Sequence, residues 1–119
     1  MNFVGEKFDK SNPKRFNRVW ICQQIRADLK EAFNKDWKFG VRKEPGNSNS
    51  IRITFKKAPE EAINRNGRNG IIYGMLEINE PYMSKIERIV NAYNYDNSDG
   101  QIDYFDRNYY VYYDFDLNI

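Results

Sequence analysis

The sequence predicts an α+β fold in which two helices pack on one face of a mainly antiparallel sheet of three or four strands, in the order α-β-β-β-α-β. Apolar residues recur with a helical period in two segments, they alternate with polar residues in others, and turn-forming residues separate these segments. With 119 residues, 40% of them hydrophobic, the chain is expected to form a single domain over residues 1–119.

The chain is predicted to begin with a polar, flexible arm over residues 1–15. Phe3, Val4 and Phe8 are its candidate anchor points, and the turn dipeptide Asn12-Pro13 leads toward a helix. The arm therefore offers a few apolar contacts but no regular element of its own.

A helix is predicted from about Arg15 to Asn34. One apolar stripe runs along it, with Cys22 at its edge, while charged and polar residues occupy the rest of the helical wheel. The stripe consists of Ile21, Ile25, Leu29, Ala32 and Phe33. This face is expected to pack on the sheet.

The two segments after this helix alternate with period two, which predicts two strands. The turn-rich stretch EPGNSNS separates them, so they should pair as an antiparallel hairpin. The apolar face of this hairpin is formed by Trp37, Phe39, Val41, Ile51, Ile53 and Phe55. The opposite face carries Lys38, Arg42, Arg52 and Lys56.

The middle of the chain is predicted to be a loop followed by a strand and a second helix. Residues 58–70 contain strong turn dipeptides and one helical turn at Pro59–Ile63. A less regular third strand is expected at Ile71–Ile78, and a helix from Pro81 to about Tyr93.

Residues 109–119 alternate again and predict a two-sided final strand. The set expected to face the core is Tyr109, Val111, Tyr113, Phe115, Leu117 and Ile119. The set expected to face water is Tyr110, Tyr112, Asp114, Asp116 and Asn118. In an alternative arrangement, the N-terminal arm covers Tyr110 and Tyr112.

Composition excludes several kinds of chemistry. The chain has no histidine and a single cysteine, Cys22. Zinc sites built on His, Cys-His and Ser-His-Asp nucleophiles and an intrachain disulfide are therefore ruled out. We therefore expect neither an enzyme nor a bound cofactor or metal. No apolar run is long enough to span a membrane and no secretory signal opens the chain, so a cytoplasmic protein without membrane contact is expected.

Charge is distributed unevenly, which indicates a charged partner. Residues 1–70 hold 16 lysines and arginines against 8 acids, whereas residues 71–119 hold 3 against 9. Two candidate surfaces follow. Exposed tyrosines beside carboxylates predict a protein-binding surface at Tyr110, Tyr112, Asp114 and Asp116. The basic hairpin face predicts, as the alternative, an RNA- or DNA-binding surface at Lys38, Arg42, Arg52 and Lys56.

An acidic loop near the end of the chain raises a third hypothesis, a hard-cation site for a metal-dependent enzyme. The carboxylates that would supply it are Asp96, Asp99, Asp103 and Asp106. Their spacing departs from that of a calcium-binding loop, because Tyr95 falls where the first ligand belongs. A solvated loop held by turn and capping hydrogen bonds is the favoured interpretation.

Two segments resemble a known family. ICQQIRADLKEAF with KFGVRK and IRITF resembles the opening, and YNYDNSDGQIDYFDRNYYVYYDF the closing block, of the large polyvalent protein-associated domain that is twenty-ninth in its numbered series. The resemblance implies a phage or conjugative-element protein inside a bacterial host cell, but no activity or site residue. It therefore predicts a small accessory protein that binds a host protein or ribonucleoprotein stoichiometrically, as an anti-CRISPR inhibitor binds a CRISPR effector.

Overall fold

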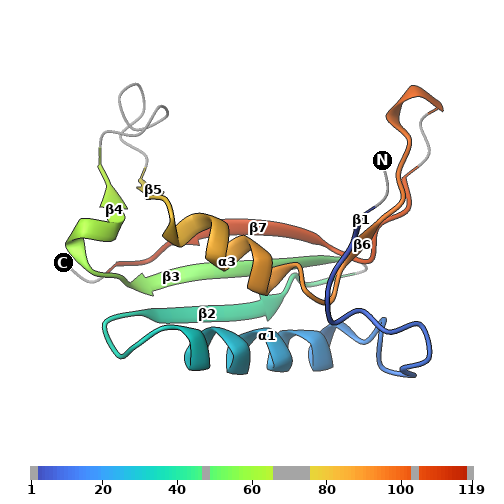
Figure 1. Cartoon of the computed structure of the whole chain (residues 1–119), viewed down its shortest axis with the longest axis horizontal. Coiled ribbons are helices and arrows are strands. Elements are labelled where there is room, and N and C mark those ends of the chain that lie inside the picture. Colours follow the sequence, from blue (N-terminus) through green and yellow to red (C-terminus); the bar gives the residue numbers. More distant parts are fainter. Residues whose placement is uncertain (1–2, 47–48, 66–75, 103–104, 118–119) are drawn as a thin grey trace.

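The computed structural model describes residues 3–46, 49–65, 76–102 and 105–117. It confirms the α+β class and the predicted order of the main elements (Figure 1). The helices are α1 (Arg18–Ala32) and α3 (Tyr82–Val90), and the short 3-10 turns are η1 (Glu60–Ala62) and η2 (Gly100–Ile102). The strands are β1 (Phe3–Val4), β2 (Lys38–Lys43), β3 (Ser50–Lys57), β4 (Ile63–Asn64), β5 (Glu77–Ile78), β6 (Tyr95–Asp96) and β7 (Tyr110–Phe115).

The main sheet has three strands in the order β2-β3-β7. The predicted hairpin is confirmed, since β2 runs antiparallel to β3 with Val41 opposite Ile53. The final strand joins on the other side of β3 but parallel to it, with Ile53 opposite Tyr113. Parallel neighbours need a long crossover connection, and the chain between β3 and β7 supplies one that contains α3.

One hydrophobic core lies between the helices and the sheet. In the predicted stripe Ile21, Ile25 and Leu29 are fully inaccessible to solvent, whereas Ala32 and Phe33 are partly buried. The buried side chains from the other elements include Val41, Ile51, Ile53, Phe55, Ile86, Val90 and Tyr109. Each fully buried aliphatic side chain contributes about 2 kcal/mol through the hydrophobic effect, so this layer is the main source of stability.

Both helices are shorter than the sequence predicts. The side chain of Asn17 caps α1 by accepting a hydrogen bond from Trp20 N at 3.0 Å, which places the start of the helix at Arg18. The backbone turns extended at Phe33 and ends α1. Helix α3 ends at Val90, and Tyr93 is buried beyond its C-terminus rather than on its last turn.

The expected third strand is described only in part. Residues 71–75 lie outside the described residues, and Glu77–Ile78 form β5. This strand pairs with β4 in a separate two-stranded ribbon, where Ile78 lies opposite Ile63. The predicted helical turn just ahead of β4 is confirmed as η1.

The N-terminal arm lies against the segment that follows α3. Strand β1 pairs antiparallel with β6, so that Val4 lies opposite Tyr95, and Gly5 N donates to Asn94 O at 2.8 Å. Phe8 packs on the ring of Tyr95 with a centroid separation of 5.1 Å. Two segments that are far apart in the sequence, β1 and β6, thus lie side by side (Figure 1).

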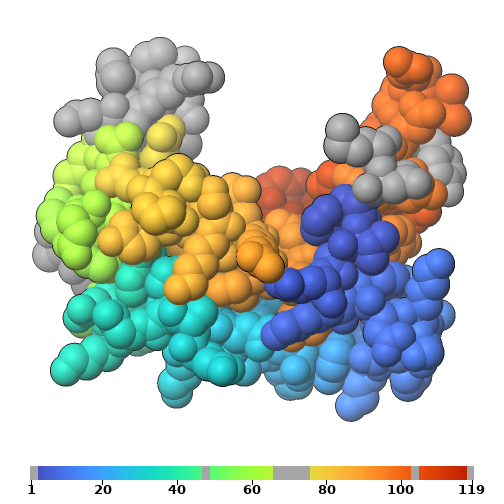
Figure 2. Space-filling view, viewed as in Figure 1, coloured from blue at the N-terminus to red at the C-terminus, as the bar shows by residue number. Residues whose placement is uncertain are grey.

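Beyond β6 the chain forms a projection that we call the finger, comprising residues 95–102 and 105–107. Asn97 N donates to Asp106 O, and Asn108 N donates to Tyr95 O, so the two sides of the finger are hydrogen-bonded across its base. The finger projects from the body of the molecule (Figure 2). Among the described residues, no helix is long and apolar enough to cross a membrane.

Gly5 tests whether the docked arm contributes to stability. A Cβ atom at this position would lie 2.3 Å from Asn91 O and 2.4 Å from Ala92 O, and these backbone atoms are fixed at the end of α3. We expect Gly5→Ala to displace the arm, to lower the free energy of unfolding by about 2 kcal/mol, and to speed proteolysis within the arm.

The matched control is Gly100→Ala, because a Cβ atom there meets no described atom within 4 Å. We expect it to change the free energy of unfolding by less than about 0.5 kcal/mol in urea titrations. Equal effects of the two substitutions would show that the arm does not depend on the close approach at Gly5.

Candidate functional site

The open sheet face is the side of the main sheet that points away from the helices. Its side chains are those of Lys38, Arg42, Arg52, Thr54, Lys56, Tyr110, Tyr112, Asp114 and Asp116. The register places Arg42, Arg52 and Tyr112 in one row across the three strands. Because β7 joins β3 directly, the two surfaces predicted from the sequence are parts of the same face.

Arg52 lies at the centre of this face and is held from two sides. Its Nε donates to Glu44, its Nη1 lies 3.5 Å from Asp114 Oδ2, and its guanidinium lies 5.8 Å from the ring centre of Tyr112. The hydrogen bond to Glu44 raises the pKa of Arg52. This arginine is thus neutralised within the molecule, which distinguishes it from the other three cations of the basic set.

Those three cations are exposed. Lys38, Arg42 and Lys56 have no ion-pair partner within the described part of the chain. Gly40 lies between Lys38 and Arg42 on β2, and a hollow of about 530 Å³ opens beside it, lined also by Thr54 and Asp114. Positive and negative side chains therefore border one depression.

The tyrosines of β7 differ from each other. Tyr112 is 49% exposed, as predicted, whereas Tyr110 is partly buried beneath the guanidinium of Arg107, which lies 5.0 Å from its ring centre. The described ring contacts of the N-terminal arm go to Tyr93 and Tyr95 instead. Of the predicted protein-binding set, Tyr112 and Asp116 are the exposed members and Asp114 is partly exposed.

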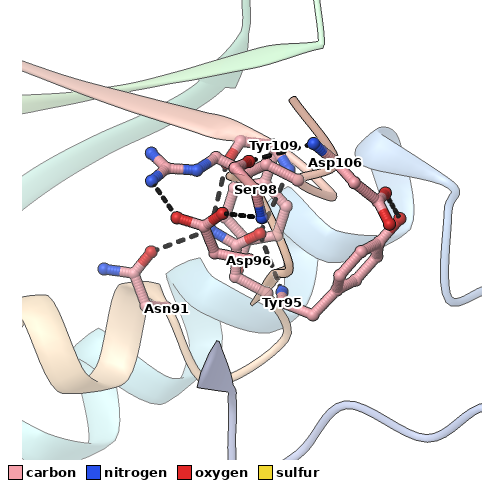
Figure 3. A network of polar contacts seen from close by, with 8 residues as sticks. Asn91, Tyr95, Asp96, Ser98, Asp106 and Tyr109 are labelled. Atoms are coloured by element: carbon pink, nitrogen blue, oxygen red, sulfur yellow. Dashed lines mark hydrogen bonds and ion pairs between the residues drawn. The ribbon is translucent and has the colours of Figure 1, made fainter. Parts of the chain in front are cut away.

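The closing block of the sequence is organised around the buried side chain of Asn94. Its Nδ2 donates to Tyr109 O and to Asn91 Oδ1, both at 3.0 Å. Its Oδ1 accepts from Tyr109 N at 3.1 Å and from Tyr95 N at 2.9 Å (Figure 3). One amide thus joins the end of α3, the start of the finger and the start of β7.

Two further residues extend this network. The amide of Asn108 donates to Arg15 O at 2.9 Å and to Tyr93 O at 3.1 Å, and the hydroxyl of Tyr109 donates to Val90 O at 2.7 Å. Burial raises the pKa of Tyr109 well above its usual range, so this hydroxyl keeps its proton. Asn94, Asn108 and Tyr109 therefore have structural roles.

The acidic residues of the finger are also used in its construction. Asp96 accepts hydrogen bonds from Arg107 and Ser98, which lower its pKa to about 2 (Figure 3). Asp106 accepts from the hydroxyl of Tyr95 at 2.8 Å, and Asp99 accepts from Gln101 N at 3.0 Å.

These pairings bear on the hard-cation hypothesis. Asp103 lies outside the described residues, and among the described ones no three acidic or cysteine side chains gather in a way that could hold a metal ion. The carboxylates of Asp96 and Asp99 accept turn hydrogen bonds from backbone N–H groups two residues on, and the carboxylate of Asp106 accepts from the hydroxyl of Tyr95. This agrees with the favoured sequence interpretation of the loop.

Sequence reasoning missed a group of exposed apolar side chains around the finger. Ile102 is 71% exposed and Phe105 67% exposed, and the arm adds Phe3 and Phe16. A hollow of about 520 Å³ at the base of the finger is lined by Phe3, Val4, Phe8, Phe16, Tyr95 and neighbouring polar residues. The signal was present, because Ile102 and Phe105 are apolar residues in a loop otherwise rich in aspartate and asparagine.

The Asn94 network predicts a large cost for losing one buried amide. Asn94→Ala would remove the side-chain partner of Tyr109 N, Tyr109 O and Tyr95 N, so we expect the free energy of unfolding to fall by about 3 kcal/mol. Asn97→Ala is the control, since Asn97 is exposed and its side chain makes no hydrogen bond with the described residues. Urea unfolding measures both, and a cost below about 1 kcal/mol for Asn94→Ala would contradict the prediction.

Comparison with known proteins identifies the family. A family model described as Large polyvalent protein associated domain 29 matches residues 17–118, a range that includes α1, the main sheet and the closing block. No curated protein and no solved structure gives a significant match. Since the family model covers more than half of the chain, the protein belongs to the Large polyvalent protein associated domain 29 family.

Proposed function

We propose that this protein is a small accessory protein of a phage or plasmid that binds a host protein or ribonucleoprotein stoichiometrically through the open sheet face. We further propose that it acts in the bacterial cytoplasm as a counter-defence inhibitor of a CRISPR effector. The observation that carries the binding role is the half-exposed ring of Tyr112 beside the guanidinium of Arg52, which Glu44 and Asp114 hold in place.

This arrangement has the properties of an interaction hot spot. Tyrosine and arginine dominate binding energy in protein interfaces because they offer large contact areas with polar ends. Here the arginine is already ordered by two carboxylates, and the tyrosine side chain stands on a strand of the main sheet. Binding a partner would therefore cost little conformational entropy at these two residues.

The charges of the open sheet face favour a partner with a mixed surface. The cations Lys38 and Arg42 lie on β2 and Lys56 lies on β3. The carboxylates lie on the other side of the sheet face, Asp114 on β7 and Asp116 directly after it. A partner presenting charges of both signs would match this pattern. A uniform row of phosphates would meet two carboxylates as well as the cations.

Two features support a binder rather than an enzyme. The chain has no histidine, and its single cysteine, Cys22, is buried in the core, where burial raises the pKa of the thiol and disfavours the reactive thiolate. The family assignment supports the origin in a mobile element, where inhibitors of host defence commonly act by occupying their target.

The leading experiment compares Tyr112→Ala with Val19→Ala, because Val19 on α1 is similarly exposed at 51%. Both variants are expressed in cells in which a CRISPR effector restricts a phage, and both are used to capture that effector. We expect Tyr112→Ala to weaken capture about 30-fold and to restore restriction, in keeping with a loss of about 2 kcal/mol at a hot spot.

Val19→Ala should behave as wild type in both assays. Loss of function in a variant whose circular dichroism and unfolding midpoint match wild type would support the proposal. Full inhibition by a well-folded Tyr112→Ala variant would remove the open sheet face from the interaction. Absence of inhibition by the wild-type protein across CRISPR effector types would contradict the counter-defence role.

A second candidate function is RNA or DNA binding, favoured by the exposure of Lys38, Arg42 and Lys56 on one face without described ion-pair partners. Binding through these cations should weaken as salt rises, because each phosphate contact releases counterions. We expect the triple variant Lys38→Gln/Arg42→Gln/Lys56→Gln to make the negative slope of log K against log salt less steep by about two to three.

The matched control is Lys10→Gln/Lys14→Gln/Lys30→Gln, which removes the same charge from exposed positions on the arm and α1. Fluorescence anisotropy with labelled single- and double-stranded RNA and DNA at about 50 mM salt measures both variants. No binding by the wild-type protein, or equal effects of the two triple variants, would contradict this second function.

A further inference from the structure

The outer edge of β7 carries backbone groups that the sheet does not use. Tyr110 N donates to Asn49 O and Asp116 N donates to Phe55 O, each at 2.9 Å, so alternate residues of β7 bond to β3. In a parallel ladder, the N–H and C=O groups of the residues between them point away from that neighbour. These residues are Val111, Tyr113 and Phe115, and their backbone groups have no partner within the described part of the chain.

The opposite edge of the sheet is covered at one position by a side chain from α1. Arg26 reaches from α1 and donates through Nη2 to the carbonyl oxygen of Val41 on β2. Exposed edges invite pairing with other chains, and a long basic side chain laid along the strand is a common way to block this. Within the described residues, β7 has no comparable cover, so the two edges of the sheet differ.

A groove of about 990 Å³ runs beside the outer edge of β7, bordered by α3 and β5. Its apolar lining is formed by Phe55, Leu76, Ile78, Met83, Tyr113 and Phe115. Three glutamates also line it, Glu77, Glu80 and Glu87, and no lysine or arginine does so among the described residues. Figure 1 shows α3 and β5 following one another along this side of the sheet.

Two polar atoms at this groove lack hydrogen bonds. Tyr113 Oη and Asp114 Oδ1 are buried and have no partner, and they are the only such side-chain atoms among the described residues. Burial and the charge of Glu87 raise the pKa of Tyr113, so its hydroxyl stays protonated as an unused donor. Both residues belong to β7 and line the groove, which marks this edge as the least satisfied part of the described fold.

We propose that the outer edge of β7 binds an extended segment of a partner protein as a fourth strand, and that this segment alternates apolar with basic residues. The backbone of the segment would bond to Val111, Tyr113 and Phe115. Side chains on its helix-facing side would contact Met83 and Ile78, and the basic residues would meet the three glutamates. Strand addition supplies affinity through the backbone, and the pockets supply selectivity.

This edge is separate from the contacts of Tyr112 on the open sheet face, and its test does not depend on them. The probe is a synthetic peptide of about eight residues that alternates lysine and valine, titrated into the ¹⁵N-labelled full chain. We expect the amide signals of Val111, Tyr113 and Phe115 to shift and their hydrogen exchange to slow at least tenfold. The amides of Tyr110 and Tyr112, which already bond to β3, should respond much less.

Charge is tested on both partners. The peptide with glutamate in place of lysine should not bind, and Glu77→Gln/Glu87→Gln should weaken binding of the lysine peptide about tenfold, since each exposed pair contributes modestly. Glu31→Gln/Asp36→Asn removes the same charge from exposed positions outside the groove and should leave binding unchanged.

Three outcomes would overturn the proposal. The first is an absence of shifts at the three edge amides at millimolar peptide. The second is equal binding of the lysine and glutamate peptides. The third is a concentration-dependent shift of the same amides without peptide, which would identify a second copy of this chain as the occupant.

Discussion

The fold depends on one buried amide, that of Asn94. The side chain of Asn94 fixes the backbone of Tyr95 and Tyr109, and the backbone carbonyl oxygen of the same residue accepts the hydrogen bond from Gly5 that holds the N-terminal arm. Three segments that are distant in the sequence therefore meet at a single residue. An amide has two donors and acceptor lone pairs, so it can satisfy several buried backbone groups at once, and no apolar side chain could replace it there.

This junction determines where β7 enters the sheet. With Tyr109 held beside the end of α3, the following residues are directed along β3 and pair with it in parallel. The parallel pairing then brings Tyr112 beside Arg52 and Asp114 within reach of the same guanidinium. The open sheet face and the outer edge of β7 are thus both products of the polar network, although the network itself contributes few of their exposed side chains.

The hydrophobic periodicity of the sequence predicted the main helices and strands, but it did not predict which distant segments pair with each other. The stripe of Ile21, Ile25 and Leu29 and the alternation of Ile51, Ile53 and Phe55 identified α1 and the hairpin because each pattern reports burial within one segment. Periodicity could not predict the parallel register of β7 or the docking of Gly5, because each joins residues far apart in the sequence. It also could not predict the ion pair between Arg52 and Glu44, which depends on side-chain rotamers. Ile102 and Phe105, two apolar residues in an acidic loop, were not singled out from the sequence because the loop was interpreted through its charges.

The parallel placement of β7 has a consequence for the nascent chain. About fifty residues separate the end of β3 from the start of β7, and ribosomes add about 5–20 residues per second. For several seconds, therefore, the hairpin of β2 and β3 has emerged while the strand that seals β3 has not. During that interval β3 presents Ile51, Ile53 and Phe55 on an unprotected edge, so the yield of folded protein should depend on chaperones that bind extended apolar segments.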